Sequence, residues 1–375
     1  MGGPLTGLTV IEMEGLGPCP LAGQFLADLG AEVIVIVRKS SEADPTDINN
    51  RSKKSVALNL KSPEGVDIAF KLVARSDILI EGFRPGVMER MGLGPEICQE
   101  RNPGLIYGRI TGWGQTGPLA DCAGHDINYM AITGFLNAIG KPGEPPLPPL
   151  NIAADYAGGT MFLLLGILSA LYERHKSGKG QIVDAAMVDG VPALMALIHS
   201  WLARGNWEQE RGRNLLDGGA PYYRTYETSD GKYISVGPLE PQFFSRLVEL
   251  AGLPELDDKA RKDQNNWPEM HQAYEQIFLA KTRDGWTDIL EGTDACFAPV
   301  LSWSEAPHHH HLHERGTFVD VDNVMQAAPA PRFSRTPASV PVTPNAPGSD
   351  TEQILKEIGY DNSTITNFRE NGVLT

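Results

Sequence analysis

The first half of the chain alternates short apolar runs with longer segments whose apolar residues recur at helical spacing. The apolar runs lie at residues 8–13, 32–37, 56–60, 78–80, 106–111 and 181–187. A helical pattern covers residues 21–29, and another begins at Ser62, a residue that suits a helix N-cap. Because strands that alternate with helices indicate a parallel sheet, we predict an α/β fold, with a Rossmann-like parallel sheet and helices on both faces.

Beyond Gly205 the pattern becomes that of a second, smaller α+β domain. Two short runs at 223–228 and 233–236 flank Ser-Asp-Gly-Lys, a sequence typical of a β-hairpin turn. Helices are expected at about 241–251, 268–281 and 284–291, and a last short strand at 297–301. Residues 302–348 are rich in proline and lack periodicity, which predicts a long return connection.

These patterns predict two domains joined by two linkers. The large domain comprises residues 1–200 and is completed by a C-terminal tail at 330–375, whose pattern is helical at 350–358 and 362–371. The small domain comprises residues 223–303. The linkers are residues 201–222 and 304–329.

The first strand leads into Gly15 and Gly17, which is also how a dinucleotide-binding motif begins. The motif then fails, because its third glycine position holds Pro20 and the second strand ends in Arg38 instead of an acid. An arginine at that place favours a phosphate group. The sequence therefore argues against a nicotinamide dinucleotide.

Net charge limits the class of partner. The formal net charge of −15 argues against nucleic acid or an anionic membrane, and an anionic ligand would need a local basic patch. The segment that ends in Arg51, Lys53 and Lys54 is a candidate for that patch, with a solvated loop as the alternative interpretation.

Four scattered cysteines, with no metal or redox spacing, suit a reducing cytosol. The N-terminus lacks the pattern of a signal peptide, and the apolar run 161–171 is too short to span a bilayer. We therefore expect a cytoplasmic protein that is not embedded in a membrane.

Candidate chemistry lies between Gly124 and Gly159, where two loops each turn into a helix. Asp126 suits the N-cap of the first helix, and Asp155 lies at or near the N-cap of the second. With His125, Asp155 makes a plausible acid–base pair, and the free N–H groups of a helix start can stabilise an oxyanion. The alternative is that both aspartates only cap helices and that His125 packs locally.

The motifs GHDINY, PPLNIAADYAGG and VGPLEPQFF, with EGFRPGV, RITGWGQTGP and GKGQIVDAAMVDG in the expected order, resemble those of the α-methylacyl-CoA racemases. That family belongs to the class III CoA-transferase (CaiB/BaiF-like) superfamily. The resemblance implies interconversion of (2R)- and (2S)-2-methylacyl-CoA thioesters through an enolate, with no metal or nicotinamide cofactor. It also implies an interlocked homodimer.

The resemblance implies roles for individual residues. His125 and Asp155 match the two bases, and Glu240 matches a small-domain glutamate that orients the imidazole. Without the resemblance, Glu240 would be taken for a solvated acid before Pro241. The residues that match CoA or substrate contacts are Arg38, Leu58, Asn59, Leu60, Lys61, Gly82, Phe83, Arg84, Arg90, Gly124, Asp126, Ile127, Asn128 and Tyr129.

Two other functions stay open. A class III CoA-transferase would use Asp155 as the nucleophile that accepts the acyl group. A non-catalytic acyl-CoA-binding protein would not need His125, Asp155 and Glu240 together, and the pairing of His125 with Glu240 favours racemisation. The histidine run from His308 to His313 lies in a proline-flanked segment where adjacent side chains fan outward, so no metal site is predicted there.

Overall fold

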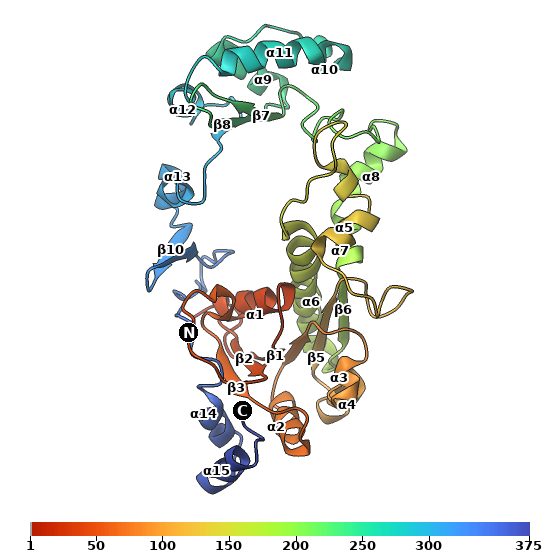
Figure 1. The fold of residues 1–375 in the computed structure, drawn as a ribbon, viewed down its shortest axis with the longest axis vertical. Coiled ribbons are helices and arrows are strands. Elements are labelled where there is room, and N and C mark those ends of the chain that lie inside the picture. Colours follow the sequence, from red (N-terminus) through yellow and green to blue (C-terminus); the bar gives the residue numbers. More distant parts are fainter. Residues whose placement is uncertain (1) are drawn as a thin grey trace. The chain divides into compact units, whose positions relative to one another are not determined.

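A computed structural model describes residues 2–375, which form two compact units (Figure 1). Unit 1 comprises the chain up to Thr133, Leu150–Leu194 and Gly316–Thr375; unit 2 comprises Gly134–Pro149 and Met195–Arg315. Residues 134–149 therefore pack with unit 2, although the sequence placed them in the large domain. The predicted linkers at 201–222 and 304–329 stay a prediction, because compactness alone does not define a linker.

Unit 1 is built on a six-stranded sheet in which every neighbouring pair is parallel, in the order β3-β2-β1-β4-β5-β6. The strands are β1 (Thr9–Met13), β2 (Glu32–Val37), β3 (Lys54–Ala57), β4 (Ile78–Glu81), β5 (Ile106–Thr111) and β6 (Ile182–Ala186). Val10 in β1 pairs with Val33 of β2 on one side and Ile78 of β4 on the other. This strand order is that of doubly wound α/β proteins and confirms the predicted Rossmann-like fold.

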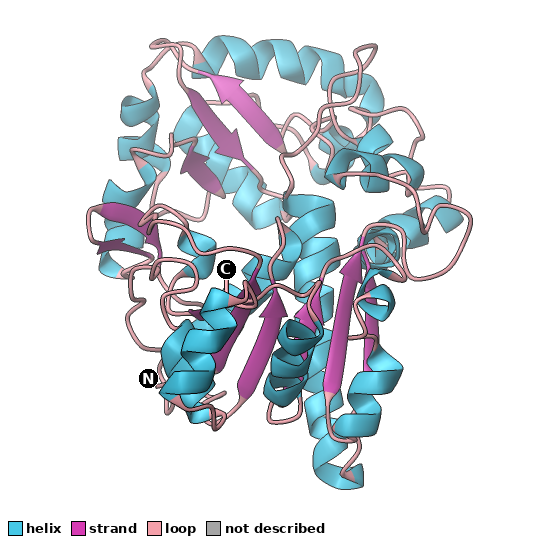
Figure 2. Cartoon of the chain, turned by 60° about the horizontal axis from the view of Figure 1, so that its bottom comes forward, coloured by secondary structure: helices cyan, strands magenta, loops and turns pink. Residues whose placement is uncertain are grey.

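Helices pack against this sheet (Figure 2). Unit 1 contains α1 (Pro18–Asp28), η1 (Ile48–Asn50), α2 (Pro63–Val73), α3 (Val87–Arg90), α4 (Pro95–Arg101), α5 (Asp126–Ile132), the π-helix η3 (Ile152–Thr160), α6 (Met161–Ser177), α7 (Met187–Leu194), α14 (Thr351–Glu357) and α15 (Asn362–Glu370). Its main apolar core joins alternate residues of the strands to Ile68 of α2, Cys98 of α4, Ile354 of α14 and Ile365 of α15. The patterns missed α3 and α4, which are short.

The helix that carries Asp155 is longer than the apolar run alone indicates. η3 continues directly into α6 and gives a 26-residue helix, Ile152–Ser177, long and apolar enough by length and composition to cross a membrane. The expectation that this run is too short was therefore wrong. One face of α6 packs on β5 and β6, with Leu163 and Ile167 buried, while other apolar residues of the helix are exposed, among them Leu165 and Tyr172.

The C-terminal segment packs beside the edge strand β3. The amide of Ala57 donates to Thr351 Oγ1 at 3.0 Å, and the amide of Asn59 donates to the Val373 carbonyl at 2.9 Å. Leu58 forms an antiparallel bridge with Leu374. The segment thereby lies at the strand end where Leu58–Lys61 were expected to contact a ligand.

Unit 2 has a three-stranded antiparallel sheet in the order β7-β8-β9, as the hairpin signal predicted for its first two strands. Its elements are η2 (Leu136–Ala138), α8 (Ala196–Ala203), β7 (Arg224–Glu227), β8 (Tyr233–Val236), α9 (Pro241–Ala251), α10 (Asp258–Lys262), η4 (Gln264–Asn266), α11 (Trp267–Phe278), α12 (Arg283–Leu290), β9 (Phe297–Pro299), η5 (Ala306–His308) and α13 (His310–Glu314). Aromatic side chains dominate its core: the Tyr226 ring packs against Phe278, and Phe278 packs against Trp286.

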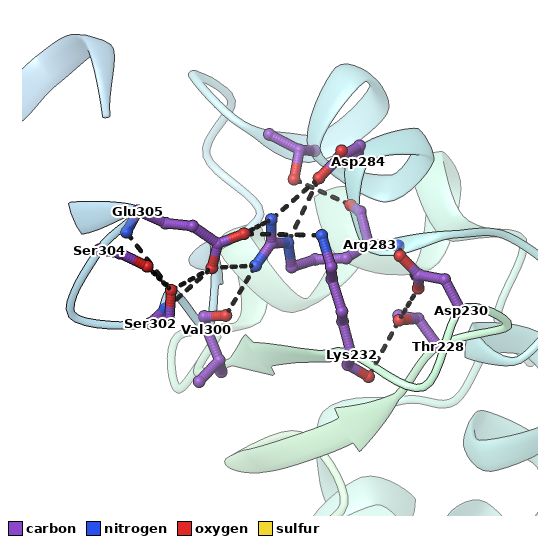
Figure 3. Close-up of polar contacts among 10 residues, drawn as sticks. Thr228, Asp230, Lys232, Arg283, Asp284, Val300, Ser302, Ser304 and Glu305 are labelled. Carbon is purple, nitrogen blue, oxygen red and sulfur yellow. Dashed lines mark hydrogen bonds and ion pairs between the residues drawn. The ribbon is translucent and has the colours of Figure 1, made fainter. Parts of the chain in front are cut away.

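The segment 302–348, predicted to be irregular, contains regular structure. It includes η5, α13 and a hairpin of β10 (Phe318–Val321) and β11 (Val324–Ala327). Its first part is held in unit 2 by Glu305, whose carboxylate accepts hydrogen bonds from Arg283 at 2.7 and 2.9 Å (Figure 3). That pairing, with hydrogen bonds from Ser302, holds the pKa of Glu305 well below its usual range. The apolar pattern of the sequence could not predict this segment, because a pair of charged side chains holds it in place.

Candidate functional site

A cavity of about 740 Å³ lies in unit 1 at the carboxyl ends of β1, β2 and β3. Parallel α/β sheets bind ligands at this edge, next to the point where the strand order reverses. Six of the predicted ligand contacts line the cavity: Arg38, Leu58, Asn59, Leu60, Lys61 and Phe83. The sequence did not predict the other lining residues, which are Met13, Glu14, Ile36, Val37, Met91 and Thr375.

Arg38 is held at this cavity through its backbone. Its amide donates to Glu14 Oε2 at 2.9 Å, and its carbonyl accepts from Thr375 Oγ1 at 2.7 Å. Within residues 2–375 neither Arg38 nor Lys61 makes a salt bridge. Two cations without carboxylate partners, beside apolar walls, suit an anionic ligand that also has an apolar part.

Three other predicted contacts, Gly82, Arg84 and Arg90, do not line this cavity. Gly82 lies close to α1: a Cβ there would be 3.3 Å from Cys19 Cβ. The guanidinium of Arg90 lies near Gly86, where a Cβ would be 3.0 Å from Nη1. The charge of Arg84 acts on Tyr129: burial and the charge of Asp155 raise the pKa of that phenol, and Arg84 opposes the rise.

The structure decides the open question about the basic segment at residues 51–54. Arg51 is buried and pairs with Asp28, and Lys53 is buried and pairs with Glu12 at 2.6 Å. Lys54 pairs with Glu32, also at 2.6 Å. Neither alternative holds: two of the three cations are buried in ion pairs of unit 1, so the segment forms neither a phosphate patch nor a solvated loop.

His125 is the N-cap of α5, and its side chain is exposed. The expectation that Asp126 is the N-cap was wrong by one residue: the His125 amide donates to Asn128 Oδ1 at 3.0 Å, which closes the first turn one position earlier. The Tyr129 hydroxyl donates to the Gly124 carbonyl. The Tyr129 ring packs edge to face against Trp113, with the ring centroids 4.7 Å apart. The start of α5 is therefore anchored on both sides of His125.

Asp155 lies in the first turn of η3, whose N-cap is Asn151. Burial raises the pKa of Asp155, and the negative charge of Asp126 raises it further. A hydrogen bond from Asn151 and the charge of His125 act in the opposite direction. A carboxyl group with a raised pKa is better suited to accept and return protons near neutral pH.

The backbone amides around this pair differ in their partners. Asp126 Oδ1 accepts from the amides of Ala154 and Asp155, at 2.9 and 2.8 Å. The amides of Asp126 and Ile127, at the start of α5, donate to no acceptor in the described part of the chain. These two amides are the ones predicted as oxyanion donors, whereas the amides of Ala154 and Asp155 already donate to Asp126.

Glu240, the third predicted catalytic residue, belongs to unit 2. It is exposed and is the N-cap of α9. Its charge contributes to a raised pKa of Cys296, whose largest cause is burial. The predicted role of Glu240 beside an imidazole stays a prediction.

Sequence reasoning missed a second cavity, of about 840 Å³, within unit 2. Its lining includes Arg224, His271 and Cys296. Arg224 Nη1 lies 2.7 Å from His271 Nδ1, and His271 Nε2 lies 2.8 Å from the Gly219 carbonyl. No motif marked these residues, because strand, helix and loop residues far apart in the chain meet only in the folded unit.

The histidine run forms η5 and the short helix α13. His309 Nε2 lies 2.7 Å from Glu291 Oε1. Among the described residues, no group of three or more His, Cys, Asp or Glu side chains is arranged to hold a metal ion.

The segment that carries Asp155 packs closely against α7. A Cβ at Gly190 would lie 1.9 Å from the Gly158 carbonyl oxygen, and a Cβ at Gly158 would lie 2.8 Å from a Val191 methyl. Only glycine permits this approach of two backbones. The contact sets the position of η3 three residues beyond Asp155.

The structure is that of an α/β protein with a cavity at its strand ends that Arg38 and Lys61 line, and with His125 and Asp155 on two segments joined through Asp126. The chain belongs to CoA-transferase family III, whose profile matches residues 5–351. It is 43% identical over 373 residues to the alpha-methylacyl-CoA racemases of Mus musculus and Homo sapiens, with 99% of this chain and 97% of each relative covered. Among solved structures it resembles a CAIB/BAIF family protein from Brucella suis, with a TM-score of 0.80 and 27% identity over 96% of this chain and 100% of that one.

Proposed function

We propose that the protein is an α-methylacyl-CoA racemase, an isomerase that interconverts (2R)- and (2S)-2-methylacyl-CoA by proton exchange at the α-carbon. The observation that carries the proposal is the link between the two proposed bases in unit 1. The residue next to His125 binds the backbone of Asp155, and the charge of His125 acts on the Asp155 carboxyl. A histidine and a carboxylate held in this way match a two-base exchange.

In this mechanism one base removes the α-proton, and the electron pair of the C–H bond moves into the thioester carbonyl to form an enolate. The amides of Asp126 and Ile127 stabilise the enolate oxygen, a contribution of about 10²–10³ in rate for one such donor. The conjugate acid of the other base then protonates the opposite face. Each proton transfer by a well-placed group contributes a factor of about 10²–10⁴ in rate.

The CoA part of the substrate is proposed to occupy the cavity at the carboxyl ends of β1–β3. Arg38 and Lys61 would pair with its phosphates, and Leu60 would contact its apolar portions, whereas the predicted contact Leu58 is 1% exposed and packs in the core behind the cavity. Gly82, Arg84, Arg90, Gly124, Asn128 and Tyr129 stay proposed contacts outside that cavity.

The alternative, acyl transfer through Asp155, makes a different experimental prediction. The racemase incorporates deuterium from D₂O at the α-carbon of a single 2-methylacyl-CoA, with no second substrate. A transferase needs a second carboxylic acid and exchanges the acyl group. Acyl exchange without α-deuterium incorporation would overturn the proposed function.

We further propose that the protein forms an interlocked homodimer, in which His125 would face Glu240 of the partner subunit. An exposed apolar row on α6, made of Met161, Leu165, Leu168 and Tyr172, supports a second copy there, because each side chain is at least 42% exposed. A sedimentation experiment at micromolar concentration should give a dimer, and a monomer would contradict the proposal.

The same function sets our proposals for cofactor and location. Proton exchange is redox-neutral and both proposed proton carriers are side chains, so the reaction needs no metal or nicotinamide. Activity should persist after dialysis against a chelator. The net charge of −15 supports a protein without nucleic-acid or membrane partners, which we place in the cytoplasm.

Arg38→Ala should raise KM for 2-methylacyl-CoA and weaken its dependence on salt concentration, because a cation that meets the phosphates is lost. Arg84→Ala tests in the same way a proposed contact outside that cavity. Lys179→Ala, which removes an exposed lysine just beyond α6, is the matched control and should leave KM unchanged. An unchanged KM in both arginine variants would remove these residues from the CoA site.

Gly190→Ala should impair catalysis without touching a catalytic group. Its new methyl group would meet the Gly158 carbonyl oxygen at 1.9 Å, so η3 must move away from α7. We expect a loss of about 1–3 kcal/mol in the free energy of unfolding from overpacking, together with a fall in kcat. Gly104→Ala is the control, because its Cβ would have no neighbour nearer than 3.6 Å. Wild-type kcat in Gly190→Ala would show that η3 need not be held here.

A further inference from the structure

We infer that Asp126 is a positioning residue, whose carboxylate ties together the two segments that carry the proposed bases. The inference rests on the proposed function for its kinetic consequences. Its structural basis is independent of that function and consists of two hydrogen bonds to one buried carboxylate and one covalent link along the backbone.

The first two contacts are the hydrogen bonds that Asp126 Oδ1 accepts from the amides of Ala154 and Asp155, at 2.9 and 2.8 Å. These are the third and fourth residues of η3, within the turn whose N–H groups have no partner inside the helix. Asp126 therefore caps η3 from a different part of the chain, 28 residues earlier.

The third link is covalent. Asp126 is the first residue of α5, and His125, its N-cap, is bonded directly to it. A shift of the Asp126 carboxylate away from η3 would therefore change the position of His125 relative to Asp155. The two bases must reach opposite faces of one carbon atom, so catalysis depends on their separation. We call the Asp126 carboxylate with its two hydrogen bonds the clamp, and we infer that it sets this separation.

The side chain is well enough buried to act as a clamp. Asp126 is 6% exposed, and its Oδ2 atom is enclosed without a hydrogen-bond donor among residues 2–375. Burial strengthens the two hydrogen bonds at Oδ1, because their surroundings have a lower dielectric constant than water.

The clamp also has an electrostatic effect. The Asp126 charge raises the pKa of Asp155, second to burial, while Asn151 and His125 lower it. Tyr129, on the same helix as Asp126, is near both carboxylates, and Arg84 is near Tyr129. Removing the Asp126 charge alone should therefore lower the pKa of Asp155. The acid limb of the pH–rate profile should then move to lower pH for the epimer whose proton Asp155 removes.

Two substitutions separate position from charge. Asp126→Asn keeps an oxygen that can accept both amides, so kcat should stay within about tenfold of wild type while the acid limb shifts. Asp126→Ala removes the acceptor. It should lower kcat about 10–100-fold for both epimers, with KM changed by less than about threefold, since small misplacements of reacting groups have effects of this size. Asp121→Ala, which removes an exposed carboxylate of the preceding loop, is the matched control.

A second readout does not depend on activity. Amide hydrogen–deuterium exchange in the segment 151–161 should be faster in Asp126→Ala and near wild type in Asp126→Asn. If the wild-type protein shows no α-proton exchange, the proposed function fails, and this measurement still tests the clamp. Wild-type protection and kcat in Asp126→Ala would overturn the inference. Equal losses of kcat in the Ala and Asn variants would also overturn it.

Discussion

His125→Ala is expected to remove α-deuterium exchange from one face of 2-methylacyl-CoA, and Asp155→Ala to remove it from the other. Each base handles the proton of one epimer, and racemisation needs both of them. Either substitution should therefore lower net racemisation by about 10² or more, the usual contribution of a placed acid–base group. The measurement is α-deuterium exchange on each separate epimer by each variant.

The pattern of losses identifies the reaction type. Residual exchange with opposite stereochemical preference in the two variants would support two bases. A transferase predicts that Asp155→Ala abolishes acyl exchange as loss of a nucleophile and that His125→Ala has little effect. Full racemisation by His125→Ala would contradict the assignment of His125 as a base.

Lys53→Met is expected to lower the free energy of unfolding by about 3–5 kcal/mol, because it leaves the buried carboxylate of Glu12 without its partner. The Lys53–Glu12 pair is 2.6 Å long and almost fully enclosed beneath α1. Burial raises the pKa of Glu12 to about 7, although Lys53 opposes the shift. Urea unfolding at neutral pH measures the loss.

The pH dependence gives the sign of this effect. The folded-state pKa of Glu12 lies above its ordinary value of 4.5, so the folded state binds more protons and stability falls as pH rises from about 4.5 to 7. The deficit of Lys53→Met should therefore be smaller at pH 5 than at pH 8. The neighbouring Lys54→Met is the control. Its pair with Glu32 is partly exposed, so a loss of only about 0–1 kcal/mol in the free energy of unfolding is expected. Equal losses in the two lysine variants would show that burial does not govern the pair.

The fold of unit 1 was predictable because strand and helix patterns alternate along the chain, and β1 to β5 are mostly buried; β6, whose first three residues are exposed or half-buried, is the exception. Those two periodicities are local, and a parallel sheet follows from their alternation. Some short elements were missed: α3 and α13 have only four and five residues, too few to show a period, whereas α4 was missed although α14, of the same length, was predicted. The resemblance supplied Arg38 and Leu58–Lys61 as ligand contacts, and the parallel strand order places them at one edge of the sheet, where the structure has a cavity.

What the sequence by itself determined was therefore the parallel sheet with helices on both faces; the candidate ligand residues at the strand ends and the candidate bases His125 and Asp155 came from the resemblance. Only the tertiary structure decided which charged groups stabilise the fold. Arg51 and Lys53 look like ligand residues in the sequence, but their partners Asp28 and Glu12 are 23 and 41 positions away. The role of Asp126 was hidden for the same reason. Local pattern showed a helix cap, whereas its oxygen binds amides 28 and 29 residues further along. The periodicity of apolar residues indicates which face of an element is buried. It does not indicate which polar groups come into contact when elements distant in the chain pack together.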